Sequence, residues 1–208
     1  MTALSELRGQ VDRRTGHFLT DDALNDLINE ALRALSLEAR WPWLDATATL
    51  TWPDDEAGVS VTTTTMPWTW QVIKSVVANG RDEYLARAQR DLETSDGVSG
   101  GDWTFGFAVH GRTITMAPAP AAGVAVRILG TRNEGPLVND VDEPFLPDDY
   151  TDPVVHYACA LAFDRHNDPG RRSSHMAEYE RWVKRMKRSV RDQASGPRVP
   201  RVRPGGGL

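Results

Sequence analysis

The sequence predicts an α+β protein: N- and C-terminal helices form a helical bundle, a small β-sandwich or barrel-like module is inserted between them, and an extended tail ends the chain. At both ends, apolar residues recur every three to four positions, which is typical of amphipathic helices. In the middle, short Thr/Val-rich runs alternate apolar and polar residues and are separated by Gly, Pro, Asn or Asp. With 208 residues, 40% of them hydrophobic, the chain can bury a sizeable core.

Residues 1–44 are predicted to form the N-terminal helices of the helical body. Thr2 is expected to cap the first helix, and Gly16 to end it. Thr20 is expected to cap a second, longer helix whose broad apolar face should pack on more than one neighbour. This helix should end near Trp41, because a proline follows and disfavours helical geometry in the residue before it.

Residues 45–133 are predicted to form the inserted β module, with about six strands. That number is too large for one face of a helix pair, so the strands should close into a small sandwich or barrel. One hairpin is expected in "AVHGRTITM", turning at His110-Gly111. The candidate strand segments are 45–52, 58–65, 70–80, 82–85, 103–111, 112–118 and 123–130.

Residues 134–193 are predicted to form an acidic linker and the C-terminal helices of the same body. Pro153 suits the first turn of one helix, and "HNDPG" should end it. A last helix is expected from about Arg171 to Gln193, with Asp168 as its N-cap. Its apolar face holds Met176, Tyr179, Val183, Met186 and Val190, and basic residues line the opposite face.

Residues 194–208 are predicted to form an extended Arg/Pro/Gly tail that contributes nothing to the core. A Pro/Arg segment prefers polyproline geometry, so it loses less entropy on docking than a flexible polar chain does. Its arginines can bind carboxylates in a bidentate manner. The tail is therefore either disordered, as in an isolated monomer, or held by a partner.

The charges are unevenly distributed along the chain. The net charge of −5 argues against a general attraction to nucleic acid or to an anionic membrane. Between residues 134 and 152 there are 7 acidic residues and no Lys or Arg, whereas from residue 181 onward there are 9 basic residues and 1 acidic one. Such blocks are usually solvated faces. Because the blocks have opposite signs, neighbouring copies of the protein or a charged partner could also use them.

No group of residues forms a recognisable active site, so the sequence predicts no enzyme, no cofactor and no metal. Asp164, His166 and Asp168 are spaced two apart and do not share a helix face, which favours structural roles over metal binding. Cys159, the single cysteine, excludes a disulfide framework, fits a reducing cytoplasm and is expected to be a buried hydrophobe. No stretch approaches the ~20 apolar residues of a membrane span, which predicts a soluble protein that is not exported.

The chain carries 7 tryptophans, an unusual number for its length. Most are expected to pack the junction between helices and strands. The functional alternative is an aromatic platform for a glycan, as in a carbohydrate-binding sandwich. That alternative leaves the helices, the acidic linker and the tail without a role.

Several runs, taken in order, carry a resemblance that spans about residues 4–165. They are "LSELRGQVDRRTG", "LTDDALNDLINEALRALSLEARWPWL", "TATLTW", "TWQVIKSVV", "DEYLARAQRDLE", "FAVHGRTITMAPAPAAGVAVRILGTR" and "DEPFLPDDYTDPVVHYACALAF". In this order they resemble the head-to-tail adaptor (connector) proteins of tailed bacteriophages. One departure is Met66-Pro67-Trp68, where related chains often carry Leu-Pro followed by an acidic residue.

The resemblance implies a structural virion protein without enzymatic activity. Such adaptors assemble, usually as dodecameric rings, beneath the portal, where they extend the DNA channel and receive the next neck or tail protein. The implied partners are further copies of the chain, a portal protein, a downstream neck or tail protein, and dsDNA that passes through the lumen without specific binding. The implied location is the virion neck, after synthesis in the host bacterial cytoplasm.

The charged segments acquire expected roles in such an assembly. The C-terminal segment of an adaptor commonly leaves the ring and lies along the portal, so the tail is the expected portal-binding element. A basic face on the last helix is expected to meet a neighbouring subunit or partner, and an acidic group in the linker to line the channel. The tail residues are Arg198, Val199, Pro200, Arg201, Val202, Arg203, Pro204 and Leu208. The basic face consists of Arg181, Lys184, Arg185 and Arg188. The acidic group consists of Glu134, Asp140, Asp142, Glu143, Asp148 and Asp149. The alternatives are another neck component, such as a head-completion or tail-terminator protein, and a phage-encoded glycan-binding module.

Overall fold

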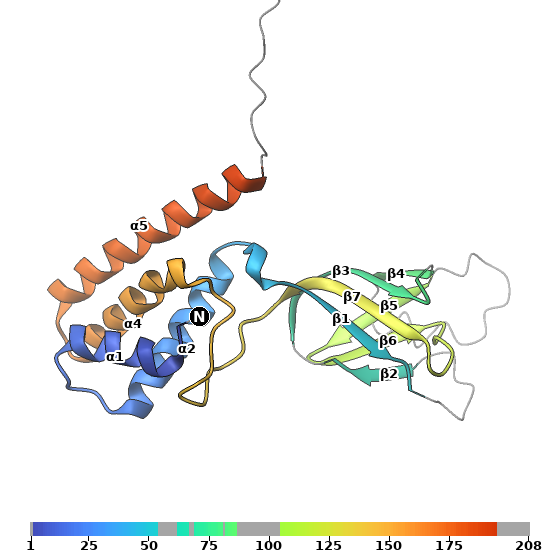
Figure 1. Cartoon of the computed structure of the whole chain (residues 1–208), viewed down its shortest axis with the longest axis horizontal. Coiled ribbons are helices and arrows are strands. Elements are labelled where there is room, and N and C mark those ends of the chain that lie inside the picture. The colour runs from blue at the N-terminus through green and yellow to red at the C-terminus, as the bar shows by residue number, and fades with distance from the viewer. Residues whose placement is uncertain (1, 54–61, 67–68, 81, 87–104, 195–208) are drawn as a thin grey trace, which may run out of the picture. The chain divides into compact units, whose positions relative to one another are not determined.

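The computed structural model describes residues 2–53, 62–66, 69–80, 82–86 and 105–194, and it confirms the α+β class (Figure 1). By their internal contacts, the residues divide into two compact units. In their described parts, the helical unit consists of residues 2–39 and 148–194, and the sheet unit of residues within 40–147.

The helical unit is built around α4 (Thr151–Arg165), which packs against α1 (Leu4–Thr15), α2 (Asp21–Glu38) and α5 (Pro169–Ala194) (Figure 1). A short 3-10 turn, η2 (Asp148–Tyr150), leads into α4. A helix that is apolar on several sides has to be covered on several sides. The buried residues of α4 fit this description: Pro153, Val154, Val155, Ala158, Cys159, Ala160, Ala162 and Phe163.

One of the two predicted N-terminal helix caps is correct. Thr20 caps α2 as expected, because its hydroxyl accepts a hydrogen bond from the N–H of Ala23 at 3.4 Å. Thr2 does not cap α1, since Ala3 occupies the N-cap position without a side-chain hydrogen bond. The hydroxyl of Thr2 instead donates to Asp148 at 2.9 Å, which joins the start of the chain to the turn before α4.

Two helix boundaries differ slightly from the prediction. α2 ends at Glu38 rather than near Trp41, because the next residue already adopts an extended backbone conformation. α5 begins at Pro169, two residues before the expected start at Arg171. The predicted N-cap role of Asp168 is confirmed, since its carboxylate accepts the Arg171 N–H at 3.0 Å.

The sheet unit contains, in its described part, one mixed sheet of seven strands in the order β1-β7-β3-β4-β5-β6-β2. All neighbours are antiparallel except β4 and β5, which are parallel. The elements are the 3-10 turn η1 (Pro42–Leu44), β1 (Asp45–Thr51), β2 (Thr62–Thr65), β3 (Trp70–Ala78), β4 (Asp82–Ala86), β5 (Gly106–His110), β6 (Thr113–Ala117) and β7 (Ala125–Arg132).

The sheet curls into a half-barrel instead of closing into the predicted sandwich or barrel (Figure 1). In the part of the chain that the structure describes, β1 pairs with β7 and β2 pairs with β6, so β1 and β2 are two separate edges. Strand twist bends the sheet. Closure would require its two edge strands to pair with each other.

The alternation of apolar and polar residues in the sequence corresponds to the two faces of the sheet. In β7, Val126 and Ile128 are buried while Arg127 and Leu129 are exposed, as the two-residue period of a strand requires. The β5–β6 hairpin turns one residue later than predicted, because His110 still pairs with Thr113. The core on the buried face includes Trp52, Met66, Val76, Tyr84, Phe107, Ile114, Met116, Val126 and Ile128.

Gly130 of β7 lies where the neighbouring strand β3 is irregular. The β3–β7 register shifts between Trp70 and Val72, and again between Ile73 and Ser75. A Cβ added at Gly130 would lie 2.4 Å from the carbonyl oxygen of Val72 and 2.8 Å from the ring of Trp70. Only a residue without a side chain fits this close approach between the two strands.

We therefore predict that Gly130→Ala destabilises the protein by about 1–3 kcal/mol, the usual cost of overpacking, because the obstructing atoms include backbone. Equilibrium urea unfolding measures the change. Gly135→Ala is the matched control, since a Cβ at that position meets nothing within 4 Å and should change stability by less than about 0.5 kcal/mol. Equal stabilities of the two variants would contradict the prediction.

Candidate functional site

The predicted basic face lies together on the outer side of α5. Arg181, Lys184, Arg185 and Arg188 are all exposed. On the opposite side of the helix, Tyr179, Val183 and Met186 are buried and Met176 and Val190 half-buried, which confirms the expected apolar face.

The cations of the basic face differ in their local contacts. Arg181 pairs with Glu178 one turn before it. The guanidinium of Arg185 lies 4.6 Å from the ring centre of Trp182, where a cation–π contact holds it. These contacts orient the two arginines but leave them exposed, so the face can meet an acidic surface of a partner.

Two residues of the predicted acidic group have structural roles in the sheet unit. Glu134 is half-buried, and its carboxylate accepts the N–H of Phe145 at 3.1 Å. Burial raises the pKa of Glu134 and outweighs the opposing effects of that hydrogen bond and of Arg132. Asp142 accepts the N–H groups of Val138 and Asn139 at 2.7 and 2.8 Å, and these hydrogen bonds lower its pKa.

The rest of the acidic group is exposed but divided between the two units. Asp140 and Glu143 belong to the sheet unit, whereas Asp148 and Asp149 belong to η2 of the helical unit. The hydrogen bond from the Thr2 hydroxyl is the main cause that lowers the pKa of Asp148. Four exposed carboxylates therefore stay candidates for a channel wall, and their role there stays a prediction. The tail residues between Arg198 and Leu208 lie outside the described residues.

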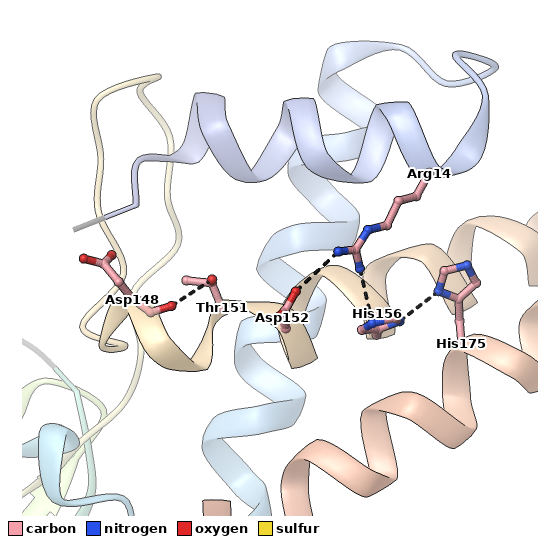
Figure 2. Close-up of polar contacts among 6 residues, drawn as sticks. All are labelled: Arg14, Asp148, Thr151, Asp152, His156 and His175. Carbon is pink, nitrogen blue, oxygen red and sulfur yellow. Dashed lines mark hydrogen bonds and ion pairs between the residues drawn. The ribbon is translucent and has the colours of Figure 1, made fainter.

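A polar cluster that sequence reasoning missed connects three helices of the helical unit (Figure 2). Arg14 of α1 lies 3.2 Å from Nε2 of His156 and 3.3 Å from the carboxylate of Asp152, both in α4. Nδ1 of His156 lies 3.1 Å from Nδ1 of His175 in α5. The partners are 142 and 19 residues apart in sequence, so no local spacing could have indicated the cluster.

The cluster determines the protonation of both histidines. A guanidinium can only donate, so Nε2 of His156 accepts and its proton lies on Nδ1. That proton is donated to Nδ1 of His175, which is therefore unprotonated. Both rings are neutral in this arrangement.

Burial lowers the pKa of both histidines, and the charge of Arg14 lowers both further. Glu178 opposes the effect at both rings, and Asp152 opposes it at His156. The electrostatics therefore favour the neutral rings that the hydrogen bonds require.

The other polar candidates of the C-terminal helices have structural contacts. Asp164 pairs with Arg172 at 3.1 Å, and Asp168 caps α5. His166 stacks on Phe18, with ring centres 4.4 Å apart. Burial raises the pKa of Cys159 to about 11, which keeps the thiol protonated and unreactive near neutral pH. Among the described residues, no three His, Cys, Asp or Glu side chains are grouped so that they could hold a metal ion.

The tryptophans that the structure describes pack against other residues. Trp41 and Trp52 are buried, and Trp41 stacks on Trp43 with ring centres 4.9 Å apart. Trp43, Trp70 and Trp182 are half-buried. Trp68 and Trp103 lie outside the described residues. The five described rings support the packing role rather than an exposed platform for a glycan.

Comparison with known proteins yields one family. The model of the SU10 adaptor protein family matches residues 2–201. No curated protein matches the chain at a significant level. In the described part of the chain, no helix has both the length and the apolar character needed to cross a membrane.

We predict that the protein loses stability as the pH falls through 6.5, the ordinary histidine pKa. At pH 8 the two histidines are neutral in both the folded and the unfolded chain. Below 6.5 the unfolded chain binds protons that His156 and His175 resist in the folded state, because their folded pKa values are lowered. The urea midpoint, followed by helical circular dichroism, should therefore be lower at about pH 5.5 than at about pH 8.

The histidine variants test the source of this loss. The double variant His156→Gln/His175→Gln should show a smaller change of urea midpoint between the two pH values than the wild type. His110→Gln, at an exposed end of β5, should keep the wild-type change. An identical pH dependence of the double variant and the wild type would assign the effect to other groups.

Proposed function

Because the chain belongs to the SU10 adaptor family, a family of phage head-to-tail adaptors, we propose that it forms a ring under the portal, extends the DNA channel and joins the capsid vertex to the neck or tail. In this proposal the ring is dodecameric, and it also contacts a downstream neck or tail protein. The observation that carries the proposal is the extent of the family match, which covers residues 2–201 of 208. The family is structural and implies a place in the virion neck.

The described side chains are consistent with a structural role. Exposed charges are concentrated on helix faces and in the segment that precedes α4, where other proteins can reach them. The buried thiol and the neutral histidine pair offer no activated nucleophile. In this proposal the protein acts by the surfaces that it presents, as the structural family implies.

The passage of DNA limits which charges can line the channel of the ring. DNA has to slide through, and a basic wall would bind its phosphates strongly. We therefore propose that acidic residues outnumber basic residues on the lumen side, with the exposed carboxylates of Asp140, Glu143, Asp148 and Asp149 as candidates. A cryo-EM map of the neck that showed a wall of mainly Arg and Lys would overturn this part of the proposal.

The tail completes the proposal as the portal-binding element. Each exposed ion pair of Arg198, Arg201 or Arg203 is worth only about 0.2–1 kcal/mol. Attachment therefore depends on many tails that act together, because a ring converts weak single contacts into avidity.

We predict that deletion of residues 194–208 abolishes or greatly weakens binding to the portal while the melting temperature of the monomer hardly changes. The reason is that a Pro/Arg/Gly segment is not expected from its sequence to add to the core, whereas many copies of it supply the multivalent contact. Co-sedimentation of the purified chain with the portal of the same phage measures binding, and circular dichroism measures melting.

Single Arg→Ala changes at 198, 201 or 203 are the matched controls and should weaken binding only mildly. A truncated chain that assembles on the portal with wild-type affinity would remove the tail from the proposal. A full-length chain that never binds the portal would overturn the adaptor function itself.

A further inference from the structure

The outer side of α2 carries a row of carboxylates. Asp22, Asp26 and Glu30 follow one another at four-residue spacing and are all exposed. The buried residues of the helix, among them Leu24, Ile28 and Leu35, lie on the opposite side. Asp22 is in the first turn, where the helix dipole favours it, but Asp26 and Glu30 lie beyond that turn. We call these three residues the acidic row.

The carboxylates of the acidic row form no ion pairs within the described part of the chain, although the exposed Arg33 follows Glu30 by three residues on the same side of α2. Asp22, Asp26 and Glu30 make no ion pair with any residue that the structure describes, whereas their neighbour Asp21 lies 3.8 Å from Arg8. Like charges four residues apart on a helix repel each other. The row therefore destabilises its own helix slightly and favours the approach of a basic surface.

The basic face of α5 has the complementary pattern. Lys184 and Arg188 are four residues apart and exposed, and neither pairs with a carboxylate among the described residues. The acidic row extends over eight residues, or ~12 Å of helix, and the basic face from Arg181 to Arg188 over seven residues, or ~10 Å. The two rows therefore match in length and are opposite in charge.

The two rows point away from each other within the helical unit. α4 packs against both α2 and α5 (Figure 1), and α2 and α5 meet each other at the ion pair between Glu38 and Lys187, which belong to neither row. The apolar faces of α2 and α5 are buried, so the charged faces opposite them are directed outward. One chain therefore cannot bring its own acidic row onto its own basic face.

We propose that the acidic row of one copy docks on the basic face of α5 of the next copy. The proposal rests on the ring put forward above and names the surfaces that would join its subunits. Two different, complementary surfaces on one unit make a head-to-tail contact, and repetition of such a contact closes into a ring when the rotation between copies permits. The occupant is a second copy because the same chain carries both surfaces in matching length and opposite charge.

Charge reversal tests the docking with the full chain. Variant A is Asp26→Lys/Glu30→Lys, and variant B is Lys184→Glu/Arg188→Glu. In either variant alone, each contact brings like charges together, so assembly on the purified portal should fall at least about tenfold, because like-charge contacts suppress association. In an equimolar mixture, A and B can alternate so that every contact again joins opposite charges, and assembly should return.

The matched control is Glu6→Lys/Glu83→Lys, which changes the net charge as variant A does but lies outside both rows, at exposed positions of α1 and β4. It should assemble like the wild type. Analytical ultracentrifugation measures assembly, and circular dichroism establishes that each variant is folded. Folded variants that assemble like the wild type, or a mixture of A and B that stays as defective as each alone, would overturn the proposed contact.

A salt titration adds a second measurement on the same samples. Exposed ion pairs are screened within about 8 Å at physiological ionic strength, so wild-type assembly should weaken as salt is raised. A wild-type chain that does not assemble with the portal under any salt condition would overturn the ring itself. A wild-type ring whose variants also assemble would overturn only the assignment of the surfaces.

Discussion

The helical unit depends on the need to cover α4. Its buried side chains occupy more than one side of the helix, from Val154 and Val155 to Ala162 and Phe163. One neighbour can cover only one side, so both ends of the chain have to contribute helices. α1 and α2 come from the N-terminal segment, and α5 follows α4 directly. This requirement brings residues more than a hundred positions apart into one core and leaves the strands between them as an insertion.

The sheet unit follows a different constraint. Along most of β7 burial alternates every two residues, which buries Val126 and Ile128 and leaves Arg127 to solvent. The alternation builds a single-sided core without requiring a closed barrel. Where β3 and β7 depart from regular pairing, Gly130 permits the close approach of Val72 and Trp70. The half-barrel is therefore held by local pairing and by packing on one face.

The polar groups of the helical unit fall into two kinds. Arg14, His156 and His175 contact one another, with Arg14 exposed and both histidines half-buried, so they join α1, α4 and α5 within one copy. The charges of the acidic row and the basic face are turned outward, and only part of them have partners within the chain. The groups that contact one another contribute to the stability of one copy, whereas the exposed charges of opposite sign are available for contacts between copies.

The sequence by itself determined the local structure and the family. The N-caps Thr20 of α2 and Asp168 of α5 and the two-residue alternation of β7 act on their own neighbourhood, so a linear pattern was enough to place them. The order of the elements likewise indicated a phage adaptor, which the family match bears out.

The tertiary structure alone decided the contacts between distant segments. Thr2 bonds Asp148 rather than capping α1, His156 meets Arg14 and His175, and the sheet stays open. Each depends on which segments pack side by side, and that is a property of the whole core rather than of any short run of residues.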